Sequence, residues 1–220
     1  MERSFVIIKP DGTARRRVSA LVLKALMDRG YKIRAFREMK VPESLAKLHY
    51  DVHKEKHFFQ WLVDFISSAP VLALIFEADD VIQGVRDALG ATFVQKADPS
   101  SLRGKYGIWA GVNIAHASDA PETATKEIEL WSNEGGLVES PDAEGLTKAY
   151  IERYSSGDAD YTMKLRDVVK NAIENSDTSD KVLESLTELM GMDAKGINPG
   201  EISALASIIF EFVKEEIEKE

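Results

Sequence analysis

Apolar residues follow two kinds of spacing over the first ninety positions of the chain. Continuous apolar runs at 5–8 and 71–76 predict short buried strands, and a loosely alternating stretch at 31–41 predicts another. Between these runs the apolar residues recur at helical spacing, which predicts helices over 18–29, 42–50, 58–66 and 81–89. Asp79 and Asp80 precede the last of these helices and are suited to cap it.

The order of the predicted elements indicates the fold. Residues 9–12, Lys-Pro-Asp-Gly, predict a turn after the first strand. Residues 91–112 contain three glycines and a proline, and irregular segments of this length in compact domains are often functional. A short strand at 113–115 and a helix at 121–130 follow. The resulting order β-α-β-α-β-α-β predicts an α+β protein, a ferredoxin-like (split βαβ) α/β sandwich with an antiparallel four-stranded sheet.

The chain changes character near residue 145, after which helical patterns replace strands. Apolar stripes at 165–173, 182–190 and 202–213 predict three amphipathic helices. We therefore expect a first domain at residues 1–150 and an acidic helical extension at residues 151–220. Each stripe must be buried, either against the first domain, in an oligomer or against a partner.

Composition and charge exclude several classes of protein. The formal net charge is −9, and residues 151–220 hold eight Lys and Arg against sixteen Asp and Glu. This balance argues against a broad nucleic-acid surface, and we expect no specific nucleic-acid partner. The absence of cysteine excludes a disulfide framework, a thiolate zinc site and a cysteine nucleophile. With no apolar run near the roughly 18 residues of a membrane span and no secretory leader, we expect a cytoplasmic protein without a membrane partner.

Three histidines, His49, His53 and His57, fall four residues apart and would align on one helix. This spacing suggests a metal site, but a partly exposed polar face beside Lys54 and Lys56 is the preferred interpretation. We expect no metal ion to be held by the protein itself.

His116 has a different context, at the end of a predicted strand. A lone histidine there is by itself more often a structural hydrogen-bonding group. Lys9 at the first strand end, and Arg86 and Arg103 beside the long irregular segment, add separated cations. Convergence of such cations on one pocket is what polyphosphate binding requires, because arginine pairs with phosphate oxygens and lysine supplies a mobile charge.

A set of ordered segments then resembles a known family. The segments are Phe5–Gly12, His49–Tyr50, Phe58–Phe59 with Leu62, Arg86 before Gly90, Thr92, Leu102–Gly104, Asn113–Asp119, Glu122 and Lys126–Trp131. In order and spacing they resemble the nucleoside diphosphate kinase family over about residues 2–140. A single motif is a moderate signal, whereas the whole ordered set is specific. The first domain would then be a nucleoside diphosphate kinase-like domain.

The resemblance implies a ping-pong phosphoryl transfer with nucleoside triphosphates, ATP among them, and nucleoside diphosphates as substrates. His116 would take the terminal phosphoryl group from the triphosphate and pass it to the diphosphate. By similarity, Glu127 would bind the ring nitrogen that is not phosphorylated, and Ser118 would hold that carboxylate. Taken singly, Glu127 would be interpreted as an ordinary surface carboxylate of a helix.

The same resemblance assigns the nucleotide contacts. Lys9, Tyr50, Arg86, Thr92 and Arg103 would bind the phosphates, with Mg2+ bridging the diphosphate oxygens.

The ribose and base contacts follow in the same way. Lys9 and Asn113 would hold the ribose hydroxyls. Phe58 would stack on the base, with Leu62 and either Val112 or Ala110 completing the slot, although Phe58 and Leu62 taken alone suggest ordinary core residues. Stacking uses a face that every base has, which predicts broad nucleotide specificity.

Some positions depart from the family pattern. Arg15–Arg17 stand where an arginine followed by a glycine is common, Ala117 replaces a glycine, Val94 stands in place of a proline, and Val112 replaces a frequent basic residue. None removes a catalytic group, so we expect an active kinase that forms a homo-oligomer. The alternative is a weakly active nucleotide-binding regulatory module of the same fold acting through the extension. A ligand sensor without phosphoryl chemistry is the least favoured interpretation.

Overall fold

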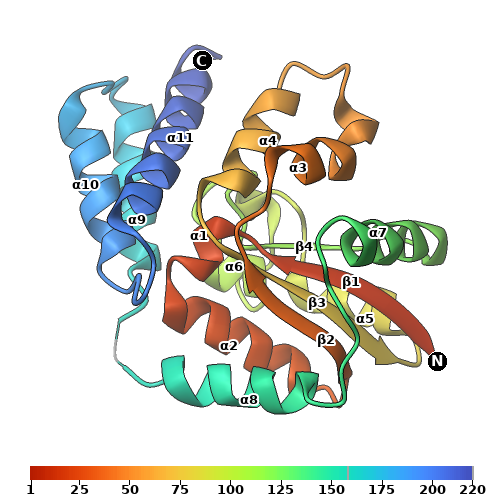
Figure 1. Ribbon diagram of the computed structural model, residues 1–220. Helices are drawn as coiled ribbons and strands as arrows, with labels where there is room; N and C mark the ends of the chain where they lie inside the picture. The colour runs from red at the N-terminus through yellow and green to blue at the C-terminus, as the bar shows by residue number, and fades with distance from the viewer. Residues whose placement is uncertain (158, 220) are drawn as a thin grey trace.

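The computed structural model describes residues 1–157 and 159–219 and has a four-stranded antiparallel sheet at its centre (Figure 1). The strands are β1 (Glu2–Ile8), β2 (Lys32–Met39), β3 (Val71–Ala78) and β4 (Ala115–Ala117). They are ordered β2-β3-β1-β4, and every neighbouring pair is antiparallel. The predicted ferredoxin-like α+β fold is therefore confirmed.

Helices cover both faces of this sheet (Figure 1). One face packs against α2 (Arg16–Met27), α5 (Val81–Leu89) and α8 (Ala143–Tyr154). The other packs against α3 (Glu43–His49), α4 (Phe59–Ser68) and α7 (Pro121–Asn133). Shorter segments are α1 (Pro10–Thr13), α6 (Leu102–Tyr106), η1 (Asp51–His53) and η2 (Val94–Lys96). The β1 and β3 strands are almost wholly buried because both of their faces are covered.

The start of the chain differs from the prediction at Lys9–Gly12, which form not a simple turn but the start of a short helix. Pro10 occupies the first turn of α1, where its missing N–H costs nothing. Gly12 is required there because a Cβ would approach Ile8 Cγ2 to 2.8 Å and the Ile114 carbonyl oxygen to 3.1 Å. This close packing fixes Lys9 at the end of β1.

The last strand begins two residues later than predicted, at Ala115 rather than Asn113. Ile114 has a left-handed backbone, with φ +69°, which delays regular pairing until Ala115. In the resulting register His116 lies opposite Ile7. His116 therefore stands within the strand rather than beyond its end.

Two local predictions before the extension were also incomplete. Asp80 precedes α5 but its side chain makes no capping hydrogen bond, because its backbone is left-handed (φ 54°) rather than extended. Helix α8 was not predicted, and it runs across the boundary expected at residue 150. Tyr150 on α8 packs against Phe36 of β2, so this helix belongs to the packing of the central sheet.

The helical extension consists of α9 (Thr162–Glu174), α10 (Asp180–Gly191) and α11 (Pro199–Ile217), the three predicted helices. They lie together beside α1 and α4 (Figure 1). Their apolar stripes share one core with Phe65, Ala69, Ile108 and Val112 of the first part of the chain. The stripes are therefore buried within the same polypeptide. None of the described helices has the length and apolar character that crossing a membrane requires.

The three arginines that depart from the family pattern bind this extension. Arg15 is fully buried and donates hydrogen bonds to the Asp11 and Tyr106 carbonyl oxygens and to Thr162 Oγ1 of α9, the last at 2.7 Å. Arg16 donates through Nε to the Lys195 carbonyl oxygen. The backbone N–H of Arg17 donates to Asp193 Oδ2 at 2.6 Å. Arg15 therefore contacts α9, and Arg16 and Arg17 contact the segment between α10 and α11.

Candidate active site

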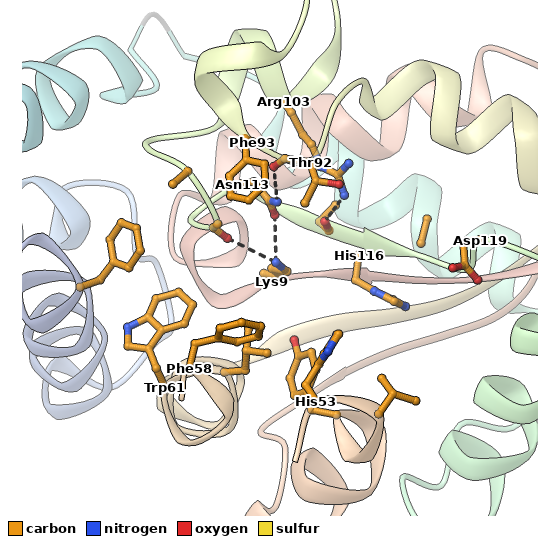
Figure 2. Close-up of a pocket in the computed structure, with 18 of the residues that line it drawn as sticks. Lys9, His53, Phe58, Trp61, Thr92, Phe93, Arg103, Asn113, His116 and Asp119 are labelled. Carbon is orange, nitrogen blue, oxygen red and sulfur yellow. Dashed lines mark hydrogen bonds between the residues drawn. The ribbon is translucent and has the colours of Figure 1, made fainter. Parts of the chain in front are cut away.

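A cleft of about 960 Å³ opens above the end of β1 and the start of β4, bordered by α4, α5, α6 and the 90–113 segment (Figure 2). Of the site residues expected from the sequence, those that line it are Lys9, Tyr50, Phe58, Leu62, Arg86, Thr92, Arg103, Asn113, His116 and Glu127. Ser118 lies behind Glu127. One cleft therefore brings together groups that are up to 118 positions apart in the sequence (Lys9 to Glu127).

His116 is held by a carboxylate. Its Nε2 lies 2.7 Å from Glu127 Oε1, and the second carboxylate oxygen accepts a 2.6 Å hydrogen bond from Ser118 Oγ. Ser118 Oγ in turn accepts from the buried Phe5 N–H. This chain of contacts orients the imidazole and leaves Nδ1 as the nitrogen without a hydrogen bond among the described residues.

Lys9 is buried at the floor of the cleft. Its Nζ donates to Asn113 Oδ1 at 2.9 Å and to the Gly111 carbonyl oxygen at 3.4 Å, and Asn113 Nδ2 donates to the Thr92 carbonyl oxygen (Figure 2). Burial lowers the pKa of Lys9 from 10.5 to about 8, because removal from water disfavours the ammonium form. The ammonium is thus poorly solvated and suited to bind an anion.

Arg103 supplies a second buried cation. It donates to the carbonyl oxygens of Gly90 and Ala115, both at 2.9 Å, which fixes the guanidinium in the cleft. Burial is the main cause that lowers the pKa of Arg103 to about 10, and the neighbouring charge of Arg86 adds to it. The positive charges of Arg86 and Arg103 repel each other, and a phosphate bound between them would relieve that repulsion.

Some buried polar atoms in the cleft lack a partner. Among the described residues, Tyr50 Oη and Arg103 Nε make no hydrogen bond, although Tyr50 is only 7% exposed. Buried donors of this kind are costly unless something binds them. Burial, reinforced by Glu127 and Asp11, raises the pKa of Tyr50, so the phenol stays protonated and able to donate.

A contact between His49 and His116 was not predicted. Its ring lies edge-on to His116, with centroids 4.8 Å apart, and its Nδ1 accepts from Trp131 Nε1 at 3.4 Å. Removal from water, with the charges of His116 and Lys9 added, holds the pKa of His49 well below its usual range. A neutral His49 therefore packs against His116 without adding a competing charge.

The aromatic end of the cleft is formed by Phe58, 36% exposed, with Leu62 and Ala110. Val112 is instead fully buried in the core shared with the extension. Trp61 and Phe93 also line this end, and sequence reasoning missed both (Figure 2). Trp61 follows Phe58 by one helical turn, a spacing that could have indicated it.

The other departures from the family pattern fit their surroundings. Ala117 is not among the residues with positive φ, so the strand accepts its Cβ without strain. Val94 is buried in η2, and its side chain packs closely against Gly107.

The histidine row does not form a helical face. Helix α3 ends at His49, and His53 lies in η1. In the described part of the chain, the one grouping with metal-ligand spacing is His49, His116 and Glu127, whose ligand atoms lie within 4.8 Å of one another. Two imidazoles and one carboxylate do not suit magnesium, which prefers oxygen ligands.

The sandwich fold and a carboxylate-held histidine in a cation-lined cleft define a phosphotransferase. The family model described as "Nucleoside diphosphate kinase" matches residues 2–136. The chain therefore belongs to the nucleoside diphosphate kinase family, as its sequence motifs indicated.

Curated relatives and solved structures agree with this assignment. The nucleoside diphosphate kinase of Methanothermobacter thermautotrophicus is 45% identical over 146 residues, covering 66% of this chain and 97% of that protein. The enzyme of Crocosphaera subtropica is 46% identical over 137 residues, covering 62% of this chain and 91% of that protein.

The solved nucleoside diphosphate kinase of Aquifex aeolicus is 36% identical with a TM-score of 0.57, over 62% of this chain and 99% of that one. That of Halobacterium salinarum, in complex with CDP, is 38% identical with a TM-score of 0.58, over 66% and 97%. These relatives are matched over nearly their whole length, so about a third of this chain lies outside the matched regions.

Proposed function

We propose that the protein transfers the terminal phosphoryl group of a nucleoside triphosphate to a nucleoside diphosphate through His116. The observation that carries this proposal is the Nε2 contact with Glu127, which leaves Nδ1 as the nucleophile. Nδ1 attacks the terminal phosphorus, the bond to the bridging oxygen breaks, and the diphosphate leaves with that oxygen. A terminal oxygen of the second diphosphate then attacks the phosphohistidine, and Nδ1 regains its electron pair.

Glu127 and Ser118 act as positioning residues for this step. A carboxylate on Nε2–H selects the tautomer whose Nδ1 carries the lone pair, and it stabilises the positive ring formed during attack. Ser118 fixes the carboxylate through its 2.6 Å hydrogen bond.

The cations bind the phosphates. Lys9, Arg86 and Arg103 line one cleft, and Tyr50 Oη and Arg103 Nε are donors without partners in the described chain. Magnesium would enter with the nucleotide on its phosphate oxygens, because the histidine-carboxylate grouping does not suit it; when bound, it neutralises phosphate charge. Thr92 contributes a further hydroxyl at the cleft.

Lys9 and Asn113 would hold the ribose, while Phe58 stacks on the base beside Leu62. This arrangement predicts that any base is accepted to some degree.

Incubation of the full-length protein with terminally labelled ATP tests the proposal. We expect an acid-labile phosphoprotein, which loses its label when GDP is added and yields labelled GTP. Initial rates at several fixed donor concentrations should give parallel double-reciprocal lines. Labelling without discharge, or nucleotide binding with very slow turnover, would instead support the regulatory module.

The pKa of Lys9 predicts a pH dependence. The charged form binds phosphate, and in the empty protein it is present below about pH 8 and lost above it. We therefore expect kcat/KM for ATP, the substrate that meets the empty protein, to fall by about tenfold for each pH unit above that value. In the Lys9→Arg variant the side chain stays charged, so the decline in kcat/KM should disappear. The highest value of kcat/KM should be lower than in the unmodified protein. A flat profile for the unmodified protein would contradict the assignment of Lys9.

Homo-oligomer formation, cytoplasmic location and the division at residue 150 stay predictions. Mass measured in solution for the full chain checks the first.

A further inference from the structure

The cleft continues beyond the family core onto the extension. Phe212, Glu215 and Glu216 of α11, and Lys219 just beyond its end, line the same cavity as His116 and Lys9. The solved relatives match only 62% and 66% of this chain while being covered almost entirely. This wall of the cleft is thus contributed by the part of the chain that those relatives do not match.

Trp61 anchors α11 to the helix that carries Phe58. Its Nε1 donates to the Ile208 carbonyl oxygen at 3.1 Å, and its ring lies 5.2 Å from that of Phe212. On its other side Trp61 stacks on Phe65, with centroids 4.8 Å apart and planes within 11°. Phe58, directly before α4, and Trp61 in its first turn lie at the same end of the cleft (Figure 2). Phe58 and Trp61, which we call the base platform, are therefore fixed in position relative to α11.

The last turns of α11 make this wall acidic. Glu216 Oε1 forms an ion pair with Lys219 Nζ, just beyond the end of the helix, at 2.7 Å. Glu215 adds a carboxylate that forms no ion pair with the described residues, so the cleft-facing part of α11 has a net negative charge. Carboxylates accept hydrogen bonds from amino groups and repel carbonyl oxygens.

We propose that α11 forms part of the nucleotide site and that Glu215 and Glu216 select bases with an exocyclic amino group. The inference rests on the proposed function, in which the base stacks on Phe58. Tyr50 Oη, without a partner among the described residues, indicates that this cleft takes a ligand, and the same cavity extends to the α11 wall. Stacking accepts every base, and the acidic wall adds a preference among them.

CDP and UDP provide the test, because an amino group on the cytosine ring is replaced by a carbonyl oxygen on the uracil ring. With ATP as donor, we expect kcat/KM for CDP to exceed that for UDP by about fivefold, as for one partly exposed hydrogen bond to a charged group. In the double variant Glu215→Gln, Glu216→Gln the ratio should fall to about one, because an amide can also donate to the carbonyl oxygen.

Glu218→Gln is the matched control, since Glu218 is an exposed carboxylate of the same turn that does not line the cleft. It should keep the preference for CDP. Equal kcat/KM for both acceptors in the unmodified protein, or an unchanged ratio in the double variant, would overturn the inference. With either of these results the protein would still transfer phosphoryl groups. If the proposed function were wrong, the protein would take up no phosphoryl group from any nucleotide.

Discussion

His116→Ala is expected to lower turnover by about 10⁴-fold or more, the scale on which loss of a nucleophile acts. Among the described residues of the cleft, the His116 imidazole is the one ring with a nitrogen held by a carboxylate: Nε2 lies 2.7 Å from Glu127 Oε1. Without His116, no group would carry the phosphoryl group from the triphosphate to the diphosphate. Binding by Lys9, Arg103 and the base platform would persist, so nucleotide affinity should change little.

The measurement is label transfer from ATP together with nucleotide affinity by calorimetry. His53→Ala is the matched control, because His53 is a partly exposed histidine that lines the same cleft without a hydrogen bond to a carboxylate. It should retain phosphoryl uptake. Full labelling of His116→Ala would assign the nucleophile to another residue.

Arg15→Ala is expected to destabilise the fold by about 3–5 kcal/mol, as for removal of one partner of a buried ion pair. Its guanidinium is fully buried, lies 3.9 Å from Asp11 Oδ2 and bonds three acceptors, one of them Thr162 of the extension. Without Arg15, the buried Asp11 carboxylate loses its main stabilising charge. Burial already raises the pKa of Asp11, and Arg15 is the largest opposing influence.

Urea unfolding at neutral pH measures this effect. Arg29→Ala, an exposed arginine, should change stability by less than about 0.5 kcal/mol. Thr162→Val removes one acceptor without changing shape and should cost about 1 kcal/mol. A loss for Arg15→Ala no larger than that for Arg29→Ala would show that the buried guanidinium does not stabilise the fold.

Much of the site was predictable because local motifs carry it. The strands at 5–8 and 71–76 and the three extension helices follow from apolar periodicity, and the ordered motifs indicated ten residues that line the cleft. The misplaced start of β4 has a tertiary cause: the Ile114 N–H bonds Asp11 Oδ2, more than a hundred positions away, and its backbone becomes left-handed. No periodicity near residue 113 reports that contact.

The departures from the family pattern were visible in the sequence, but their meaning was not. Arg15–Arg17 and Val112 stand where the family pattern commonly has other residues. In the structure they bind or pack against the extension, which a pattern for the family core alone cannot anticipate.

The sequence by itself determined the family, the sandwich fold and the helical nature of the last 70 residues, because these depend on local spacing and on ordered motifs. Only the tertiary structure decided where the extension lies and that α11 reaches the cleft. Which face of an amphipathic helix meets which neighbour depends on contacts such as that between Trp61 and Ile208, separated by 147 positions, and hydrophobic periodicity does not encode such partners.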